Sequence, residues 1–546
     1  MPMERNAKGI RPATSGAHRL RAVAVCALAL AAASSTGQID GASANPASPL
    51  IVDEAGGIIR PTPSISPTGE QVVSYLRWTE GRLPLPGLVA RSGGAPFSGF
   101  GALSTTPALD PPVIGFGSEG TALIGWHSAA GTEQTIRAPG GSIEGAGPLG
   151  ACTGPVAIAV SGANRTLAAC RAGSSSSPPW SGIVGLSELP SRVSPEAQVT
   201  PESSGPSVMP FSAWGTDGTG IASFGYTAEG PPSEQRIEAR VYGSGGSFTE
   251  TEDVGSASAP STLQPTGVAV LPNGIVAITA DTEEGGALFT RPAGPGTSFT
   301  RTEMVEDTAS MPATDQWGRL HFLTSITGGP TGTTWWVRVR ELDGSLREAI
   351  PIPTEGTGAV PVENGLQVFP NGAEAIVTRS DTGFYIAFRR PGAGAFSIPR
   401  RLAGTTGTSD GAAARTAEGD ILLTWTREVA PGRQQLTVGG WDSGTLPKIT
   451  RLSMPKQMRK GATGRFSVRA TDSMGIGRVT WQLPGNRRLE GASVRARLTK
   501  PGINRVKVTV FDEAGFRSIR IRRVKVVVPG APRIQGLAGT SGSPRP

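Results

Sequence analysis

The sequence has few charged residues, and lysine is almost absent from most of it. Charged residues make up 17% of the 546 residues, and no lysine occurs between Lys8 and Lys448. No Gly-x-Ser-x-Gly elbow, His-Glu-x-x-His helix, phosphate-binding loop or calcium loop is present. The chain therefore lacks the local signatures of serine hydrolases, zinc peptidases, nucleotide-binding enzymes and EF-hand proteins, and we predict no catalytic, cofactor-binding or metal-binding residue.

Helical periodicity is also missing. The sequence has 76 glycines and 47 prolines, and its apolar residues, 37% of the total, occur in short runs rather than in long amphipathic stretches. Many short strands joined by turns give this pattern. Recurring clusters of β-branched and aromatic residues can each bury one face, which argues against a disordered chain. We expect an all-β protein.

One longer apolar run lies near the N-terminus. Arg19 and Arg21 precede the stretch Ala22–Ala33, which is too short to span a bilayer but has the length of a signal-peptide core. Small residues at the required spacing allow cleavage after Ala44 or, alternatively, after Ala33. We predict that residues 1–44 are a signal peptide and that the mature protein has no transmembrane segment and is extracellular or bound at the cell surface.

Cysteine is scarce, with three in the chain. Cys26 falls in the predicted signal peptide, where Val25 occupies a position at which a lipoprotein signal needs a small residue. Cys152 and Cys170 flank a predicted hairpin with its turn at 161–165, so in an oxidising compartment they favour a cross-strand disulfide. Their spacing is wrong for paired thiolate ligands of a metal.

Charge divides the chain near residue 447. From Pro447 onward there are 22 lysines and arginines and four acidic residues, whereas the rest of the chain has 29 basic and 39 acidic residues. This change in composition predicts a domain boundary. We expect one domain at 45–446 and a second at 447–528, followed by a disordered tail rich in Pro, Gly and Ser at 529–546.

The first of these domains contains an internal repeat. Each unit begins at a turn that ends in Gly, or once in Asn, and the residue four positions later is apolar. The eight turn residues are Gly69, Gly120, Asn164, Gly220, Gly274, Gly318, Gly372 and Gly419. The apolar residues that follow them are Val73, Ile124, Ala168, Phe224, Ile278, Phe322, Ile376 and Leu423. They predict one buried strand face repeated eight times.

The spacing of the repeat, 44 to 56 residues with several short strands in each unit, is typical of β-propeller blades, because solenoid repeats are shorter. We predict a β-propeller of eight blades. Seven is the alternative, since ring closure can divide one blade between the two ends of the domain. A short strand around Leu50–Val52 is expected to complete the last blade.

The segment Phe384–Phe396 resembles blade repeats of exported actinobacterial β-propeller proteins that are distantly similar to sialidase-type propellers. Sialidase propellers carry a Ser-x-Asp-x-Gly-x-Thr-Trp box. Here Gly332–Trp335 has the end of such a box, with Pro330 where Asp belongs, and Asp381–Gly383 has its middle. The resemblance implies the propeller architecture and no catalytic residues.

Residues 447–528 alternate between apolar and polar side chains, as strands with one buried face do. Six or seven such strands predict a β-sandwich with Trp481 in its core. The stretch Val479–Leu483, followed by Lys500–Gly515, resembles a PKD domain or a related Ig-like module. Gln482–Asn486 replaces the aspartate- and glycine-rich turn of that family, so the resemblance implies no cation site.

The outward positions of these strands are largely basic. A polyanion-docking surface is one interpretation, and a solvated arginine-rich face is the other. Nucleic acid is not expected as a partner, because an exported chain does not routinely meet it and no aromatic residues interleave with the arginines. The candidate docking residues are Arg465, Arg469, Arg495, Arg497, Arg505, Lys507, Arg520 and Arg522.

Groups suited to catalysis are few. His127 and His321 are expected to be packed or surface imidazoles, and Asp217, Asp315 and Asp410 to be turn formers. Paired carboxylates at the mouth of a propeller would serve glycoside hydrolysis, but which acidic residues converge there does not follow from the sequence.

Two functions from different classes remain. The first is a secreted or cell-surface binding or scaffold protein, acting as a monomer, whose propeller loops contact a glycan or a surface protein while the basic sandwich docks to an anionic envelope polymer. The alternative is a secreted carbohydrate-active enzyme, a glycoside hydrolase or lyase, with carboxylates in the propeller pocket. The absence of every recognisable catalytic signature favours the first, because a fold alone does not choose between them.

Overall fold

The computed structural model describes residues 45–528 except 93–94, 174–179, 201–208, 229–232, 244–245, 259–260, 295, 305, 309–311, 330–331, 357, 371, 390, 403, 406, 417–418, 443–445, 473–475 and 513–516. The predicted signal peptide, its cleavage sites and the predicted tail lie outside the described residues. Every regular element in the described part is a strand, and no helix there is long and apolar enough to cross a membrane. The all-β prediction is confirmed.

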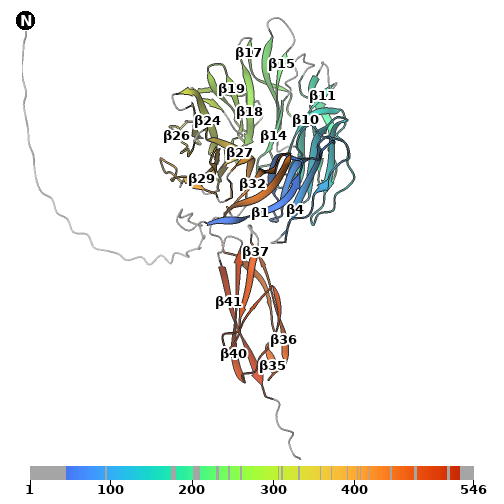
Figure 1. The fold of residues 1–546 in the computed structure, drawn as a ribbon. Coiled ribbons are helices and arrows are strands. Elements are labelled where there is room, and N and C mark those ends of the chain that lie inside the picture. Colours follow the sequence, from blue (N-terminus) through green and yellow to red (C-terminus); the bar gives the residue numbers. More distant parts are fainter. Residues whose placement is uncertain are drawn as a thin grey trace, which may run out of the picture. The chain divides into compact units, whose positions relative to one another are not determined.

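Strands β1 to β33 form eight consecutive antiparallel units, the blades of a propeller (Figure 1). The first blade contains β2 (Gly57–Ile65), β3 (Gln71–Trp78), β4 (Leu85–Arg91) and β5 (Gly101–Ala102). The second contains β6 (Val113–Phe116), β7 (Ala122–Ser128), β8 (Gly131–Arg137) and β9 (Gly147–Pro148). The third contains β10 (Cys152–Val160), β11 (Arg165–Gly173), β12 (Trp180–Glu188) and β13 (Ser194–Gln198).

The next three blades continue in chain order. The fourth contains β14 (Met209–Trp214), β15 (Gly220–Ala228), β16 (Glu234–Tyr242) and β17 (Glu252–Ser258). The fifth contains β18 (Leu263–Val270), β19 (Val276–Thr282), β20 (Gly285–Arg291) and β21 (Thr300–Met304). The sixth contains β22 (Asp307–Thr308), β23 (Ala313–Thr314), β24 (Leu320–Gly329), β25 (Gly332–Arg340) and β26 (Ile350–Pro351).

The last two blades end the ring. The seventh contains β27 (Val360–Val368), β28 (Glu374–Ser380), β29 (Gly383–Arg389) and β30 (Arg400–Arg401). The eighth contains β31 (Thr408–Arg415), β32 (Ile421–Ala430), β33 (Arg433–Asp442) and, from the other end of the domain, β1 (Asn45–Ala55). β1 pairs antiparallel with β33, with Leu50 opposite Val438. The predicted closing strand and the count of eight blades are therefore confirmed.

An apolar cluster joins each blade to the next. Eight such clusters lie between residues 52 and 441, and the last of them packs Leu422, Leu436 and Val438 of the eighth blade against Ile58 and Val73 of the first. Eight interfaces between eight blades leave no terminal blade, so the ring is closed. Full closure also removes the open sheet edges that favour aggregation.

The predicted repeat corresponds to the second strand of each blade, with one shift. In the fourth unit the turn residue is Gly218, with a φ of 85°, whereas Gly220 already begins β15. The residues four positions after the turn glycines or Asn164 are all 2% exposed or less, and each packs against the preceding blade. They are Val73, Ile124, Ala168, Ala222, Ile278, Phe322, Ile376 and Leu423. The predicted Phe224 lies two residues further on and shares the buried face.

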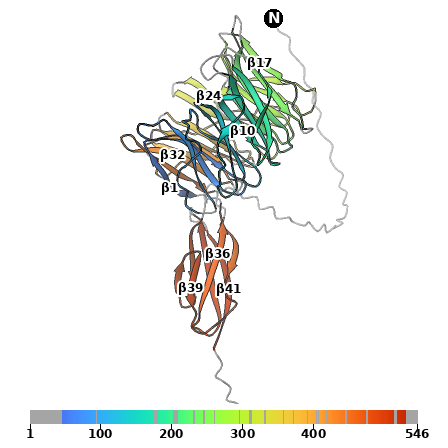
Figure 2. The same cartoon turned by 90° about the vertical axis from the view of Figure 1, so that its right-hand side faces the viewer.

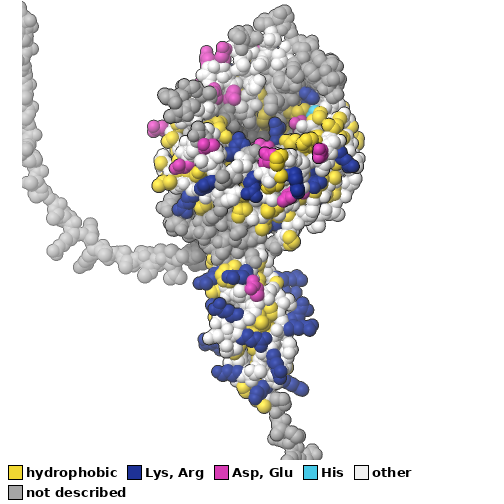
Figure 3. Space-filling view, in the orientation of Figure 1, with side chains coloured by type: hydrophobic (Ala, Val, Ile, Leu, Met, Phe, Trp, Pro, Cys, Tyr) yellow, Lys and Arg dark blue, Asp and Glu magenta, His cyan; other side chains and the backbone are white. Residues whose placement is uncertain are grey.

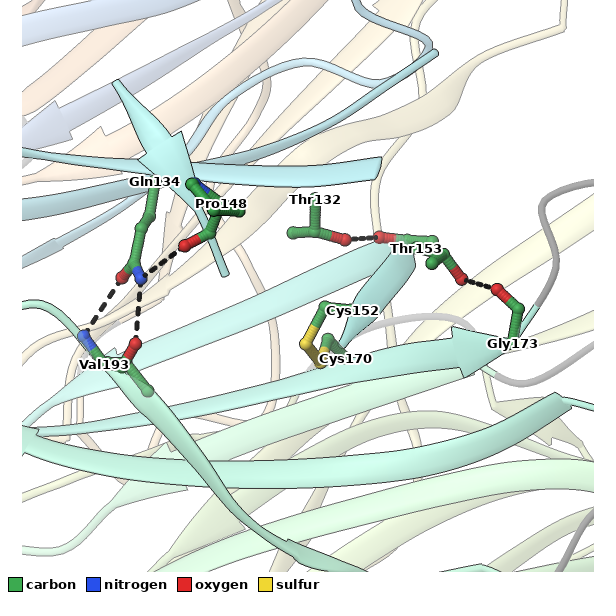
Figure 4. Close-up of a disulfide and its surroundings, with 9 residues drawn as sticks. Thr132, Gln134, Pro148, Cys152, Thr153, Cys170, Gly173 and Val193 are labelled. Atoms are coloured by element: carbon green, nitrogen blue, oxygen red, sulfur yellow. Dashed lines mark hydrogen bonds between the residues drawn. A yellow bond between two sulfur atoms is a disulfide. The ribbon is translucent and has the colours of Figure 1, made fainter. Parts of the chain in front are cut away.

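The predicted disulfide between Cys152 and Cys170 is present in the third blade (Figure 4). Both cysteines are buried, and their Cα atoms lie 5.8 Å apart on the paired strands β10 and β11. The turn between these strands is at the predicted place, where Asn164 adopts a φ of 62°. Beside the disulfide, Thr132 of the second blade donates a hydrogen bond to the Gly154 carbonyl at 2.6 Å, so the bridge stands where two blades meet.

The remaining strands form two sheets that share a core (Figure 2). The three-stranded sheet contains β34 (Lys448–Ser453), β36 (Thr463–Thr471) and β39 (Ser493–Arg497). The five-stranded sheet contains β35 (Gln457–Arg459), β41 (Arg517–Val527), β40 (Gly502–Asp512), β37 (Ile476–Gln482) and β38 (Arg488–Glu490). Trp481 is fully buried in the core, packs against Phe466 and donates a hydrogen bond to the Gly491 carbonyl at 2.9 Å. This is a β-sandwich, with eight strands where six or seven were predicted.

A buried ionic network joins the sixth and seventh blades. His321 Nδ1 lies 2.5 Å from Glu374 Oε1, and its Nε2 lies 3.4 Å from Asp315 Oδ2. Arg319 donates to Asp315 at 2.6 Å, and Arg389 to Glu374 at 2.5 Å. Because both imidazole nitrogens face carboxylates, the ring is best satisfied as an imidazolium that donates two hydrogen bonds. The expectation that His321 is a packed imidazole holds, but its packing is ionic.

The same contacts shift the pKa values of the three titratable groups. Burial alone would lower the pKa of His321, but hydrogen bonds from its ring to Asp315 and Glu374 outweigh burial and raise it above the ordinary 6.5. Burial opposes ionisation of Asp315 too, yet its hydrogen bonds with His321 and Arg319 lower its pKa to about 2. The pKa of Glu374 is lowered by His321 and Arg389 against the effect of burial.

These shifts predict a stability that depends on the charge of His321. A raised pKa in the folded state contributes stability that is complete below pH 6.5 and is lost as the pH rises through the folded-state pKa. We expect His321→Phe to lower the free energy of unfolding by about 3–5 kcal/mol at pH 6, since it breaks a buried ionic network, and by less at about pH 9. Thermal unfolding monitored by circular dichroism measures both values. Phe322→Leu, an uncharged change in the adjacent core, is the control, and equal losses for His321→Phe at the two pH values would contradict the assignment.

Candidate functional sites

The first strands of neighbouring blades lie beside one another and form the inner wall of the propeller. β2 contacts β31, β31 contacts β27, and β14 contacts both β10 and β18. The strands of each blade are antiparallel, so its second strand ends where its first strand begins, and the first strands β27 and β31 run parallel to each other. Side chains from several blades therefore converge at the end where these first strands begin, which we call the channel mouth.

A cavity of about 210 Å³ opens at the channel mouth between the seventh, eighth and first blades. It is lined by Arg60, Pro61, Val360, Pro361, Val362, Glu363, Arg379, Asp410 and Gly411. Three first strands supply most of this lining, and each is irregular at that point: β2 between Ile59 and Thr62, β27 between Pro361 and Leu366, and β31 between Thr408 and Gly411. Such bulges redirect side chains out of the regular alternation, and they are common beside binding sites.

Backbone strain gathers at the same place. Four residues other than glycine have a positive φ within the described part of the chain, and Arg60 in the cavity is one of them, at 47°. A second is Asn364, at 51°, directly after Glu363. Strained conformations of this kind cost of order 1–3 kcal/mol each and persist where the surrounding structure holds them, often at functional sites.

The charged groups of the cavity are only partly compensated. Arg379 lies 4.0 Å from Asp410. The side chains of Arg60 and Glu363 make no hydrogen bond or ion pair with any described residue, although each lies within electrostatic range of the other. Burial in the cavity raises the pKa of Glu363, Arg60 opposes this increase, and Asp410 adds to it. Both side chains are exposed, so the site offers solvated N–H donors on one wall and solvated carboxylate oxygens on another.

Asp110 and His127 extend this charged zone into the second blade. His127 is buried, and its Nδ1 lies 3.0 Å from Asp110 Oδ2. That hydrogen bond is the main cause that lowers the pKa of Asp110, with further contributions from His127, Arg60 and Arg171. His127 Nε2 is buried without a hydrogen-bond partner among the described residues, so the pair does not continue into a Ser-His-Asp triad there.

The three acidic residues predicted to form turns have different roles. Asp217 accepts hydrogen bonds from the Thr219 amide at 3.0 Å and hydroxyl at 2.7 Å, as a turn former does. Asp315 caps its turn but is also part of the buried network described above. The prediction for Asp410 is wrong, because this residue lies within β31 and lines the cavity. The sequence Ser409-Asp410-Gly411 has turn composition, yet here it forms a bulge.

The three-stranded sheet of the sandwich carries a concentrated basic face. Arg465 of β36 lies directly opposite Arg495 of β39, and Arg451 of β34 lies opposite Arg469 of β36. Arg497 continues the same face. All five side chains are exposed, and none forms an ion pair with a described residue. Four of the predicted docking residues therefore lie together on one face. Arg451 is a fifth arginine on this face, which the sequence prediction missed although the alternation of residues along β34 indicates it.

The other four predicted docking residues are exposed or half-exposed but do not share one face. Arg505 and Lys507 lie on the outer face of the five-stranded sheet, where Arg505 is opposite Arg523. Arg520 and Arg522 are opposite Val508 and Val506, so they belong to the side of the sheet that also carries the core. Figure 3 shows lysine and arginine side chains over much of the visible surface of β34 to β41, with few acidic ones between them.

Comparison with known proteins assigns no family. No family model matches the chain, and no curated protein matches it. The solved Dos1 propeller shares 11% identity over 72% of this chain and 95% of its own, with a TM-score of 0.44. A prolyl endopeptidase shares 13% over 76% of this chain and 56% of its own (TM-score 0.42), and the polysaccharide lyase Uly1 shares 9% over 72% and 99% (TM-score 0.40). Likeness of this degree concerns the propeller fold alone, and the resemblances to sialidases and PKD domains stay predictions.

The arginine pairs generate a prediction about stability. Like charges directly opposite on neighbouring strands destabilise a sheet by about 0.2–1 kcal/mol. We expect Arg495→Glu, which places a carboxylate opposite Arg465, to raise the free energy of unfolding by about that amount at low salt and by less at high salt. Urea unfolding at two salt concentrations measures the change. Arg517→Glu, whose cross-strand neighbour is Phe511, alters the net charge equally and should raise stability less. Equal effects of the two variants would show that the pairing has no local cost.

Proposed function

We propose that this protein is an exported binding protein of the cell surface, in which the sandwich docks to an anionic polymer of the envelope and the propeller contacts a glycan or a surface protein. The observation that supports docking most directly is the set of five exposed arginines on the three-stranded sheet, two pairs of them directly opposite each other. Neighbouring like charges cost stability in the free protein. An anionic polymer laid across the face would remove that cost and accept hydrogen bonds from several guanidinium groups at once.

Composition supports the division of roles. The sandwich and its tail carry 22 basic and four acidic residues, whereas the part of the chain before residue 447 has more acidic than basic residues. Attraction to a polyanion is therefore concentrated at one end of the chain. Repulsion from the acidic propeller would keep the polymer on the sandwich, and salt would screen both effects.

Docking is tested by removing one basic face at a time. We expect the full-length variant Arg465→Ser, Arg469→Ser, Arg495→Ser and Arg497→Ser to bind polyphosphate and polygalacturonate at least about fourfold more weakly at low salt, because four exposed ionic contacts of about 0.2–1 kcal/mol each are lost. The matched control replaces Arg505, Lys507, Arg523 and Lys525 by Ser, so it loses the same charge from the five-stranded sheet. Biolayer interferometry over a salt series measures the affinities. Equal losses in both variants would mean that the attraction is non-specific, and unchanged binding in the first would refute docking through this face.

A second candidate function rests on one further observation. Glu363 and Asp410 line the same cavity. Burial and Asp410 raise the pKa of Glu363, and Arg60 opposes this increase. A protonated carboxyl group can therefore lie near an ionised one. Glycoside hydrolases use two carboxyl groups in this way.

Turnover of polysaccharides separates the two candidates. If the protein is a hydrolase, both Glu363→Gln and Asp410→Asn should lower the release of reducing sugar by at least about a hundredfold, since each removes one of two required carboxyl groups. Under the binding function we expect no release of reducing ends or of unsaturated products from acidic polysaccharides by the unaltered protein. Release that both substitutions abolish would establish the enzyme instead.

A further inference from the structure

The cavity at the channel mouth contains two charged groups of opposite sign that the described residues leave unpaired. Arg60 comes from the first blade and Glu363 from the seventh, and neither side chain has a hydrogen bond or an ion pair with a described residue. Both positions are held by irregular backbone, Arg60 with a positive φ and Glu363 just before Asn364, which also has one. Both side chains are exposed, so water solvates them in the free protein, and their donors and acceptors are available to a ligand that engages both groups.

The size of the cavity limits what enters it. Sites for drug-sized ligands measure about 300–1,000 Å³, so a cavity of about 210 Å³ accommodates a smaller group, of the size of a single sugar ring. Pro61, Val360, Pro361 and Val362 provide an apolar surface against which the C–H groups of such a ring can pack. The polar groups lie at two places on this lining rather than all around it, which fixes how a ligand must be oriented.

The chemistry of the two groups specifies the ligand further. A guanidinium binds a carboxylate through two parallel N–H donors, a geometry that an ordinary hydroxyl does not match. A carboxyl group opposite it accepts hydrogen bonds from hydroxyls and, when protonated, also donates one. A single small molecule that satisfies both walls therefore carries a carboxylate at one end and hydroxyls at the other, on a ring with apolar C–H faces.

We propose that this cavity binds the ring of a carboxylated sugar, a uronic acid or a uronic-acid residue of an acidic glycan, with its carboxylate on Arg60 and its hydroxyls on Glu363. The proposal rests on the proposed function in taking a glycan as the ligand of the propeller. It uses none of the arginines of the sandwich, so the two can fail separately.

Binding should take up a proton. The groups that face Glu363 are Arg60 on β2, Asp410 on β31 and Arg379 on β28, with Asp110 near Arg60. A ligand carboxylate on Arg60 weakens the one contact that favours the ionised form of Glu363 and adds a third negative charge beside Asp410. Both changes favour protonated Glu363, so affinity should increase as the pH falls.

The experiment titrates the full-length protein with D-glucuronate and D-galacturonate, and with D-glucose as the neutral probe, by isothermal calorimetry between about pH 5 and pH 8. We expect at least one of the two uronates to bind in preference to glucose, with affinity rising by up to about tenfold per pH unit as one proton is taken up. Arg60→Asn, which tolerates the positive φ, should weaken uronate binding by about ten- to a hundredfold. Glu363→Gln should abolish the pH dependence while leaving binding of the anionic ligand intact or stronger.

Controls separate these outcomes from misfolding and from general charge effects. Arg82→Asn and Asp217→Asn make the same chemical changes away from the cavity and should leave uronate binding unchanged. Thermal unfolding of Arg60→Asn and Glu363→Gln should stay close to that of the unaltered protein, because neither side chain has a partner among the described residues to lose.

Three results would overturn the proposal: equal affinity for glucose and both uronates, unchanged binding in Arg60→Asn, or a pH dependence that persists in Glu363→Gln. Loss of uronate binding together with intact polyanion docking would reject the cavity assignment alone. Intact uronate binding without docking would reject the role of the sandwich instead.

Discussion

Burial of one face of the second strand in each blade is the interaction on which the propeller depends. Eight apolar residues at equivalent positions, from Val73 to Leu423, are almost fully removed from water, and each packs against the preceding blade. Burying a residue of this kind contributes about 1.5–3 kcal/mol for the larger side chains. Because stability is gained between the blades, the first strands are free to bulge at the channel mouth, where Arg60 and Glu363 are exposed and have no side-chain partner among the described residues.

The parts of the fold that recur are the parts the sequence predicts. The spacing of the turn glycines, the apolar residue four positions later and the closing strand all follow from patterns of short range. The turn of the fourth unit was predicted at Gly220 but lies at Gly218. The predicted buried face is still correct, because residues two apart on a strand lie on the same face. The disulfide was predictable for the same reason, since its two cysteines belong to one hairpin.

The cavity was not predictable, because it depends on irregularities that occur once. Arg60 and Glu363 are 303 residues apart and meet only after the ring closes. A weak signal was present, since Pro61 and Pro361 fall inside first strands, and proline within a strand marks an edge position such as the inner wall of a blade. For the basic face, alternation identified exposed arginines correctly, but only the register shows that Arg465 meets Arg495 while Arg520 and Arg522 lie elsewhere.

Because β1 completes the last blade, the propeller ring cannot close until β33 has been synthesised. A ribosome completes β1 first, but Val438, the partner of Leu50, follows 388 residues later. Until then the apolar face of the first blade around Val73 and Tyr75 has no neighbour, although each later blade can add to the one before it. The ring is therefore finished in a single late event. A chain that ends before β33 keeps an open strand edge and an uncovered apolar face, and both features promote aggregation of incomplete β proteins.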